Sequence, residues 1–378
     1  MTNLCYARTG PLDLVLIPGS HQRTGTADIR TEGGMQLPLP IVSFGVGSAD
    51  GVSVQKALLF NVPAVLFQRN VHDNIYHVFH DDLLPLSNLI QSDPVLADAG
   101  QRLIVAVDAH PLGKYAALYG WYGEFTSLER LRKGVPEEVE YVCFERANLD
   151  LGIETQWFPA HLIPDMAVPG RKIKALVDAV KTRWGISPER PSERVIVLIV
   201  RESSRKIVNI VELVRGLTDS FPDYEIDLVS EDRHALEDIA RRVARGRVLL
   251  GVHGALMIMG LFLQPGSLIY ELFPYGTSAA RLPYYRDMAG LSGLALRHLH
   301  WRNVRKDHPY TIVPPLTGGV FDQLPPSYVH GIKNHPDMPQ SRFHENIFWA
   351  YRKILDTTVD VGAVIGALQQ ALQDKPAE

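Results

Sequence analysis

Two arginines and a glycine-containing turn have the chemistry to bind a diphosphate. Arg201 and Arg205 follow one apolar run, and the turn at residues 253–255 (His-Gly-Ala) follows another. Guanidinium groups make paired hydrogen bonds to phosphoryl oxygens, and the amides at a helix start attract anions. Gly254 would let the backbone approach a ligand closely or adopt a positive φ, and Ala255 keeps the turn small. Taken alone, the turn fits a tight bend with a capping His253 equally well, but the arginines oppose the dipole of the helix that they precede, which favours an anion site.

Several polar residues lie where they could complete this site. Asn209 and Glu212 follow Arg205 into the next helix, and Glu231 with Asp232 follows another apolar run. Glu271 is placed to accept hydrogen bonds from a ribose diol or from sugar hydroxyls. Each of these residues alone is more often a helix cap or a loop side chain. We assign Asn209, Glu212, Glu231 and Glu271 to the donor-binding group with Arg201, Arg205, His253, Gly254 and Ala255.

A second group of reactive side chains stands at residues 74–82 (NIYHVFHDD), ahead of the apolar run LLPL. His77, Asp81 or Asp82 could act as the general base that deprotonates an acceptor hydroxyl. His77 and Asp81 also have the i, i+4 spacing of two metal ligands on one helical face, but the sequence identifies no third ligand. A polar helix-capping cluster is the remaining alternative. We predict catalytic roles for the three residues and no metal.

The second half of the chain alternates between predicted strands and helices. This alternation predicts a doubly wound parallel α/β sheet, which binds ligands at the carboxyl ends of its strands. The two arginines, the turn and Glu271 would all lie at that edge. The predicted strands are 194–200, 224–229, 248–252 and 267–272, and the predicted helices are 207–217, 233–245 and 256–263.

The first half has a mixed α/β pattern. Its predicted strands, at residues 14–17, 64–67, 103–107 and 139–143, are scattered among polar loops and helical segments. A Pro/Gly-rich stretch at 164–171 (PDMAVPGR) predicts a domain boundary. We therefore expect an acceptor-side α/β domain at 1–168, a nucleotide-binding Rossmann-like domain at 169–320, and a tail at 321–378 with helices at 346–355 and 361–372 that pack back across the domains.

Composition limits the classes of function. The 378 residues carry a net charge of -4 with no long run of one sign, which excludes the basic face of a nucleic-acid binder. The longest apolar stretch, residues 248–263, is too short to span a bilayer. The first residues show no export signal, so we expect none in this chain. Cys5 and Cys143 are the only cysteines, and we expect two reduced buried thiols, although one bridge is possible.

With these residues in place, the chain resembles glycosyltransferase family 61. The run HVFHDDLLPL at residues 77–86 carries the resemblance most specifically, and further matching segments follow in the same order. The resemblance implies a GT-B architecture, two Rossmann-like domains facing a cleft, with inversion at the anomeric carbon. It implies donor roles for the arginines, the turn and Glu271, and acceptor or base roles for His77, Asp81 and Asp82. Between Arg201 and Glu212 the spacing of individual residues matches. The further matching segments are 252–255, 262–263, 265–266, 271–275, 301–303 and 356–360.

Within the family, the resemblance is greatest to transferases that move N-acetylglucosamine from UDP to a protein-linked mannose. We therefore expect a UDP-sugar donor, a glycan or glycopeptide acceptor, and no metal cofactor, since the arginine pair would neutralise the diphosphate. Two alternatives remain: a family 61 transferase that builds a surface polysaccharide from another nucleotide sugar, and a noncatalytic sugar-nucleotide-binding protein. The family members that transfer N-acetylglucosamine to a protein-linked mannose carry an N-terminal membrane anchor and a fibronectin type III domain. The expected compartment is thus the cytoplasm for a complete chain and the endoplasmic reticulum lumen for a partial one.

Overall fold

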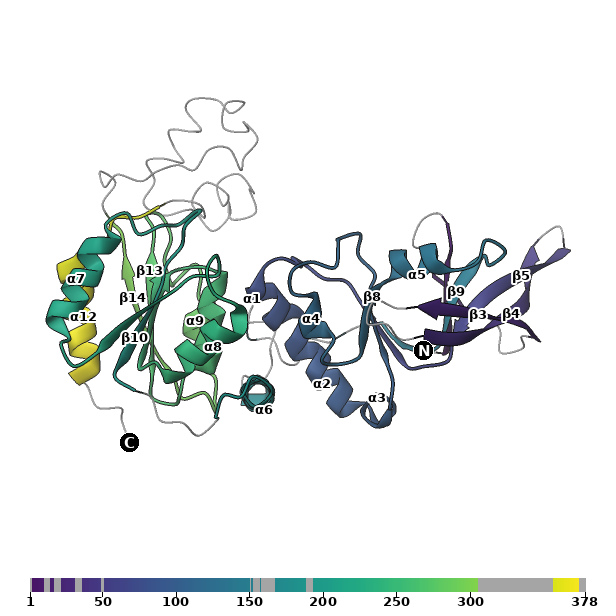
Figure 1. Ribbon diagram of the computed structural model, residues 1–378, viewed down its shortest axis with the longest axis horizontal. Coiled ribbons are helices and arrows are strands. Elements are labelled where there is room, and N and C mark those ends of the chain that lie inside the picture. The colour runs from purple at the N-terminus through teal and green to yellow at the C-terminus, as the bar shows by residue number, and fades with distance from the viewer. Residues whose placement is uncertain are drawn as a thin grey trace, which may run out of the picture. The chain divides into compact units, whose positions relative to one another are not determined.

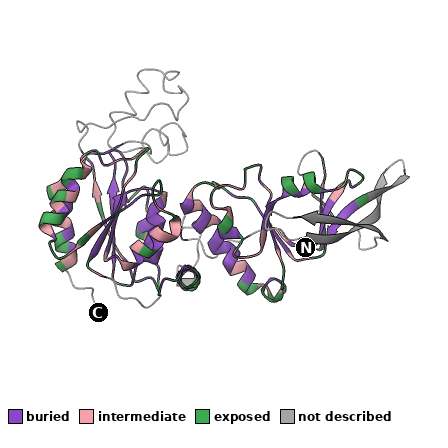
Figure 2. Cartoon of the chain, viewed as in Figure 1, coloured by how far each residue is buried: buried purple, intermediate pink, exposed green. Residues whose placement is uncertain are grey.

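The computed structural model describes the chain as two compact units, Met1–Gln156 and Trp157–Glu378, which we call the N-terminal and C-terminal units (Figure 1). In each unit, buried strands are flanked by helices whose outer faces are exposed (Figure 2). The described residues are 2–9, 14–16, 22–30, 36–48, 51–149, 151, 157, 167–187, 193–304 and 356–373.

The C-terminal unit is built on a parallel sheet. Among the described residues this sheet has five strands in the order β11-β10-β12-β13-β14. Numbered by appearance in the chain the order is 2-1-3-4-5, a doubly wound arrangement whose direction of winding reverses between β10 and β12. Ligands of such sheets bind at this switch point, beyond the carboxyl ends of the strands. The strands are β10 (Val195–Ile199), β11 (Glu225–Val229), β12 (Val248–Val252), β13 (Leu268–Phe273) and β14 (Arg297–Arg302).

Helices cover both faces of this sheet (Figure 1). On one face, α7 (Ile210–Ser220) and α12 (Val361–Gln373) pack against alternate strand residues such as Leu198, Leu250 and Tyr270. The two helices approach closely at Gly216, where a β-carbon would lie 2.7 Å from Ile365 Cδ1. The other elements of the unit are α6 (Ala167–Arg183), α8 (Leu236–Arg245), a 3₁₀ helix (Ala255–Phe262) and α9 (Tyr284–Ala289).

The predicted strands and helices of this unit are confirmed, with shifts of a few residues at their ends. One prediction was wrong in type, because residues 255–262 form a 3₁₀ helix rather than an α-helix. The Pro169-Gly170 pair, expected to mark a domain boundary, lies in the first turn of α6, where proline is tolerated. The predicted helix at 361–372 is α12 and packs on α7 within its own unit, while the predicted helix at 346–355 lies outside the described residues.

The N-terminal unit has a mixed sheet. The path β3-β4-β5-β9-β6-β7-β8 begins with antiparallel pairs and continues as parallel pairs from β5 to β8, while β1 pairs with β9 and β2. The predicted strands near 14–17, 64–67, 103–107 and 139–143 are confirmed, but the antiparallel ribbon at 22–60 was missed. The strands are β1 (Thr2–Ala7), β2 (Leu14–Leu16), β3 (Gln22–Arg30), β4 (Gln36–Ser48), β5 (Gly51–Phe60), β6 (Ala64–Phe67), β7 (Leu103–Ala106), β8 (Glu124–Ser127) and β9 (Tyr141–Asn148).

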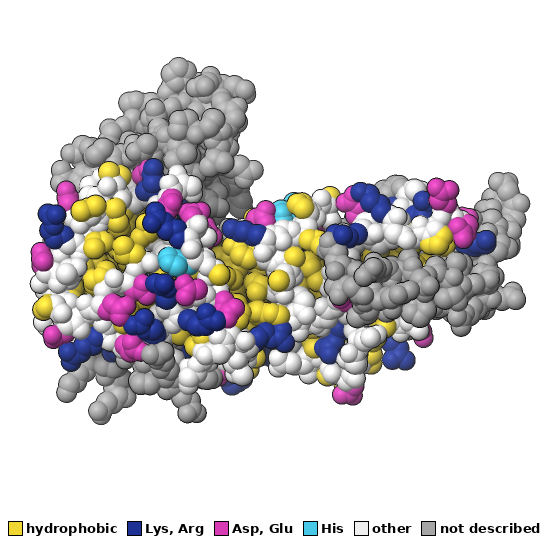
Figure 3. Space-filling model, viewed as in Figure 1, with side chains coloured by type: hydrophobic (Ala, Val, Ile, Leu, Met, Phe, Trp, Pro, Cys, Tyr) yellow, Lys and Arg dark blue, Asp and Glu magenta, His cyan; other side chains and the backbone are white. Residues whose placement is uncertain are grey.

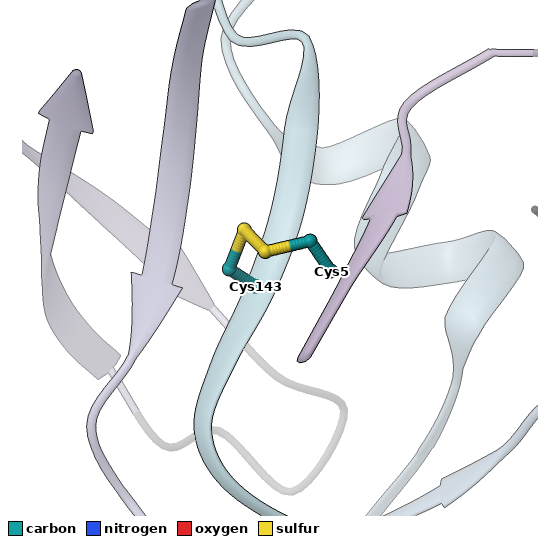
Figure 4. Close-up of a disulfide and its surroundings, with 2 residues drawn as sticks. All are labelled: Cys5 and Cys143. Carbon is teal, nitrogen blue, oxygen red and sulfur yellow. A yellow bond between two sulfur atoms is a disulfide. The ribbon is translucent and has the colours of Figure 1, made fainter. Parts of the chain in front are cut away.

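A disulfide joins Cys5 of β1 to Cys143 of β9 (Figure 4). The two strands are antiparallel and place these residues directly opposite each other, with their Cα atoms 4.0 Å apart. Both side chains are completely buried. The expectation of two reduced thiols was therefore wrong. The cysteines are 138 residues apart in sequence, so only the strand pairing reveals that they meet.

The carboxyl ends of β6 and β7 in the N-terminal unit are held together by a buried ion pair. Arg69 Nη2 donates to Asp108 Oδ1 over 2.6 Å, and Arg69 also donates from Nε and from its backbone N–H to Asp108 Oδ2. Its guanidinium group further donates to the backbone oxygens of His110 and Leu112. Because every partner is a fixed protein group, this arginine positions the loops at the strand ends rather than offering a free cation.

The helical segment after β6 runs through α1 (Ile75–His77), a π-helical turn (Val78–Leu83) and α2 (Leu84–Ser92). In the π turn, Leu84 N–H donates to Phe79 O, five residues earlier. Pro85 follows, and in an α-helix its ring would clash with the carbonyl of Asp81. Widening the turn removes that clash, and single π turns of this kind are frequent at functional sites. The other helices of the unit are α3 (Pro94–Asp98), α4 (Ala116–Tyr119) and α5 (Leu128–Gly134).

Asp82 points from the π turn into the core. Its side chain accepts a 2.5 Å hydrogen bond from Tyr119 Oη, and the residue is 2% exposed. Burial raises the pKa of Asp82 to about 7, although the hydrogen bond from Tyr119 works in the opposite direction. Asp82 is thus a buried carboxyl group that retains its proton toward neutral pH.

This raised pKa predicts how the stability of the fold depends on pH. Between the unfolded pKa near 3.8 and the folded pKa near 7, the folded protein holds a proton that the unfolded chain has released, so stability falls as pH rises. Asp82→Asn keeps a neutral acceptor for Tyr119 and avoids this loss. The variant should gain stability over wild type between pH 5 and pH 8, by on the order of 1–3 kcal/mol, in denaturant unfolding.

The matched control is Glu129→Gln, because Glu129 is an exposed carboxylate paired with Lys133. It should follow the pH dependence of wild type over the same interval. An Asp82→Asn profile parallel to that of wild type would show that Asp82 is ionised in the folded protein.

Candidate active site

The predicted anion-binding residues of the C-terminal unit meet at the switch point of its sheet. Arg201 stands two residues beyond the end of β10, and the turn at residues 253–255 directly follows β12. These two strands are neighbours in register and run in the same direction. The chain thus brings Arg201, Arg205 and the turn together at the place where doubly wound sheets bind ligands.

The two guanidinium groups lie against the backbone of the turn. Arg205 Nη1 donates to His253 O over 2.8 Å. A β-carbon on Gly254 would lie 3.1 Å from Arg205 Nη1 and 3.2 Å from Arg201 Nη1, which is tighter than ordinary side-chain contacts. Gly254 is extended, with φ 174°, so of its two predicted uses the structure shows close approach and not positive φ. The absent side chain at Gly254 leaves room for both cations.

Arg205 is held in an unusual state for an arginine. Its φ of 56° falls in the left-handed region, which costs a non-glycine residue about 1–2 kcal/mol. Its Nε is buried and has no hydrogen-bond partner among the described residues. Burial and then the neighbouring Arg201 lower the pKa of Arg205 to about 9, which leaves it charged at neutral pH. A partly buried cation beside a like charge is destabilised, and an anionic ligand would relieve both the repulsion and the lost hydration.

We call Arg201, Arg205 and the turn at residues 253–255 the clamp. Neighbouring groups fix its geometry. Tyr285 Oη donates to Gly254 O over 2.5 Å and also reaches Ala255 O, which holds the turn from behind. Arg201 Nε donates to Ser204 O over 2.9 Å, within the same loop. Tyr285 gave no signal in the sequence, because it lies on α9, far along the chain from both arginines. These hydrogen bonds hold the clamp in one geometry, and electrostatic catalysis relies on groups that are held in this way.

His253 and Glu271 form a buried pair beside the clamp. Glu271 Oε1 lies 2.5 Å from His253 Nδ1, and Glu271 Oε2 lies 2.9 Å from His298 Nε2. Glu271 is completely buried, and this burial raises its pKa well above the ordinary value. The predicted acceptance of hydrogen bonds from ribose or sugar hydroxyls does not fit this environment, since imidazoles occupy both oxygens. Glu271 instead orients the ring of His253. The sequence analysis missed His298, which lies on β14.

The remaining predicted donor residues do not line the pocket beside the two arginines. Glu231 is exposed after β11 and close enough to Arg205 to stabilise its charge, and Asp232 next to it is also exposed. Asn209 does not face a ligand: its Nδ2 donates to Val359 O over 2.9 Å, and its Oδ1 accepts from Val359 N. Glu212 is exposed and accepts from Asn209 Nδ2 over 3.2 Å. The structure thus uses the Asn209 amide to hold the chain near residue 359.

A pocket of about 320 Å³ opens next to the clamp. Its volume is at the lower end of the range of small-molecule sites, and it combines an apolar wall with a few charged groups, as such sites usually do. Its lining residues are Ile199, Val200, Arg201, Arg205, Lys206, Ile207, Val208, Ile210 and Asp356.

In the N-terminal unit, the predicted catalytic cluster divides into an accessible and a buried part. His77 Nδ1 lies 2.7 Å from Asp81 Oδ2, and the two side chains are 27% and 21% exposed. The buried His80 binds the other oxygen of Asp81 through Nδ1, over 2.5 Å. Burial opposes ionisation of Asp81, but the hydrogen bonds with His77 and His80 outweigh it and hold the pKa of Asp81 well below its ordinary value. Asp81 is therefore an anion that orients His77.

Asp82 differs from its neighbours. It is buried against Tyr119, so the structure gives it a core contact in place of the predicted contact with an acceptor. Asn70, which the sequence analysis missed, donates to Asp81 Oδ2 over 3.3 Å. In the part of the chain that the structure describes, no three His, Cys, Asp or Glu side chains group as a set of metal ligands.

The face of the C-terminal unit seen in Figure 3 shows no field of one charge among the described residues. On the face seen in Figure 3, basic and acidic side chains alternate over the C-terminal unit, with hydrophobic side chains between them. Such a mixed surface differs from the basic stripe of a nucleic-acid-binding protein. Among the described helices, none combines the length and the apolar character needed to cross a membrane.

Comparisons with known proteins identify relatives of this chain. The chain is similar to protein O-linked-mannose beta-1,4-N-acetylglucosaminyltransferase 2 of Xenopus laevis, with 28% identity over 82% of this chain and 54% of the relative. The corresponding proteins of Tetraodon nigroviridis and Mus musculus are 27% and 26% identical, each over 83% of this chain and 55% of the relative. The chain thus spans about half the length of these curated relatives.

The family comparison covers parts of both units, including His77, Arg201, Arg205 and the turn at residues 253–255. The sequence model of the family Glycosyltransferase 61 matches residues 75–270, from the start of α1 to the residue before Glu271 in β13. This match includes more than half of the chain. The protein is a glycosyltransferase and belongs to glycosyltransferase family 61.

Proposed function

We propose that this chain transfers N-acetylglucosamine from UDP-N-acetylglucosamine to a mannose linked to a protein. The observation that carries the proposal is Arg205, with a buried and unpaired Nε among the described residues, beside Arg201 at the backbone of Gly254. This arrangement is suited to a diphosphate, whose two negative groups match two cations and the start of a helix. The names of the curated relatives support the sugar and the acceptor.

The pocket next to the clamp supports a nucleoside diphosphate rather than a free phosphate. It adjoins both arginines and adds the apolar side chains of Ile207 and Val208, against which a nucleoside can pack. We propose a GT-B enzyme in which the C-terminal unit binds the donor and the N-terminal unit supplies the acceptor side. In this assignment the clamp neutralises the diphosphate and no metal ion is required.

The proposed reaction is a single displacement with inversion. The acceptor hydroxyl loses its proton to His77, its oxygen forms a bond to the anomeric carbon, and the bond from that carbon to the diphosphate oxygen breaks. The departing UDP takes the bonding electrons, and Arg201 and Arg205 stabilise its growing charge. We assign the base to His77 rather than to Asp81, because a carboxylate whose pKa is held well below its ordinary value is a weak base.

The disulfide favours a protein acceptor over a polysaccharide assembled in the cytoplasm. Disulfides form and persist in oxidising compartments and are rare in the cytosol. The Cys5–Cys143 bridge therefore supports a site of action in an oxidising compartment, where secreted proteins are glycosylated. An acceptor panel that sets mannosyl peptides against free glycan oligomers tests this part of the proposal directly.

Arg205 should be essential for turnover with UDP-N-acetylglucosamine. We expect Arg205→Ala to lower kcat/KM for transfer to a mannosyl peptide by about 10²–10³-fold, the usual effect of removing one group that stabilises transition-state charge. Arg205→Lys keeps the charge without the planar fork and should fall in between. Product formation followed by mass spectrometry gives both values.

Arg194→Ala is the control, because Arg194 makes an exposed ion pair with Asp223 on the same unit. It should retain wild-type turnover. Full turnover by Arg205→Ala would refute the clamp, and transfer to glycan oligomers but not to mannosyl peptides would refute the protein acceptor.

His77 should act in chemistry and not in donor binding. We expect His77→Gln to lower kcat by at least about 10²-fold, the usual contribution of a general base, while the Kd for UDP stays unchanged. His110→Gln replaces an exposed histidine of the same unit and should retain turnover. Wild-type kcat in His77→Gln, or loss of UDP binding in this variant, would exclude the assigned role.

A further inference from the structure

A short segment near the C-terminus is bound to the loop that follows Arg205. We call residues 356–359 the strap and residues 205–209 the clamp loop. Ile207 and Thr357 form a parallel β-bridge. Thr357 N–H donates to Lys206 O, and Val208 N–H donates to Thr357 O, each over 2.8 Å. The strap thus binds the clamp loop as one strand of a sheet binds the next.

Side chains of both segments strengthen this pairing. Asp356 Oδ1 accepts from Lys206 N over 2.8 Å, and the Asp356 side chain is buried. Asn209 makes two hydrogen bonds with the backbone of Val359, each 2.9 Å long, one as donor and one as acceptor. Every residue of the clamp loop after Arg205 is therefore connected to the strap.

The strap is anchored to the body of the unit at both ends. Asn303, just past β14, donates to Thr357 Oγ1 over 3.1 Å, and both residues are buried. After Val359 the chain enters α12, which packs on α7 and on the sheet. Because the strap is fixed to the sheet and to a packed helix, it is a rigid support for the clamp loop.

Arg205 is the residue that needs such a support. Its left-handed backbone conformation is unfavourable for an arginine and persists only where the surroundings determine it. The hydrogen bonds of the strap begin at the next residue, Lys206. A loop released from the strap could relax Arg205 toward an ordinary conformation and move its guanidinium group away from Gly254.

We infer that the strap is a positioning element that holds Arg205 in its anion-binding conformation and so sets the affinity for the donor diphosphate. The inference rests on the proposed function and deepens it. It names Asp356, Thr357, Asn209 and Asn303 as positioning residues that act through Arg205. It also explains why Asn209, predicted to bind the donor, instead uses both ends of its amide to hold the strap.

The test compares Thr357→Val and Asn209→Ala with wild type, in the full chain. Each variant removes strap contacts and leaves both arginines in place. Titration calorimetry with UDP and with inorganic pyrophosphate should show Kd values about fivefold to tenfold higher, the effect of losing one or two buried hydrogen bonds. KM for the donor should rise in parallel, while kcat and KM for the acceptor stay at their wild-type values.

Asp360→Ala is the matched control. Asp360 lies next to the strap and caps α12 through Ala363 N, without touching the clamp loop. It should leave the Kd for UDP unchanged even if it lowers the Tm as much as the strap variants do. If Thr357→Val does not fold, Asp356→Asn is the milder replacement, since it keeps the shape of the side chain and removes its charge.

A double-mutant cycle with Arg205→Ala decides whether the strap acts through Arg205. In that background, Thr357→Val should cause no further loss of pyrophosphate affinity. Additive losses, or wild-type affinity in both strap variants, would overturn the inference while leaving the clamp intact. Absence of pyrophosphate and UDP binding in wild type would overturn the clamp and the strap together.

Discussion

The repulsion between two partly buried arginines at one turn of backbone is the constraint on which the C-terminal unit depends. Arg201 and Arg205 both approach Gly254, and the carboxylate that stabilises the charge of Arg205, Glu231, is itself exposed. Two like charges this close repel each other, and a bound anion would offset that repulsion. The fold supports it from several directions: Tyr285 holds the turn, Glu271 orients His253, and the strap holds the loop that carries Arg205.

The N-terminal unit has the opposite arrangement of charges, with a negative group at its centre. There a single carboxylate, Asp81, lies between two histidines and stays ionised, while the next residue, Asp82, is buried and retains its proton. Adjacent residues thus have opposite protonation states, because the widened turn directs one side chain toward the surface and the other into the core. This separation leaves His77 as the accessible group best suited to accept a proton.

Much of this organisation could be predicted from the sequence, and the failures have physical causes. The apolar runs at β10 and β12 were enough to predict these two strands. Because parallel strands end at the same edge of a sheet, their direction predicted that Arg201, Arg205 and residues 253–255 lie together. Local patterns carry no information on long-range pairing, so the Cys5–Cys143 bridge, the contact of Asn209 with Val359 and the contact of His298 with Glu271 were missed. A sequence also does not show which residue of a polar segment is buried. For this reason Asp82 was grouped with His77 and Asp81.

The most direct test of the central claim is a crystal structure of the protein with bound UDP. We predict that the diphosphate lies at the switch point, with its oxygens in hydrogen-bond contact with Arg201, Arg205 and the backbone amides of the turn after β12. Arg205 should keep its left-handed conformation, because the strap holds the residues that follow it. UDP bound elsewhere, with Arg205 contacting only His253 O as it does in the free protein, would contradict the account.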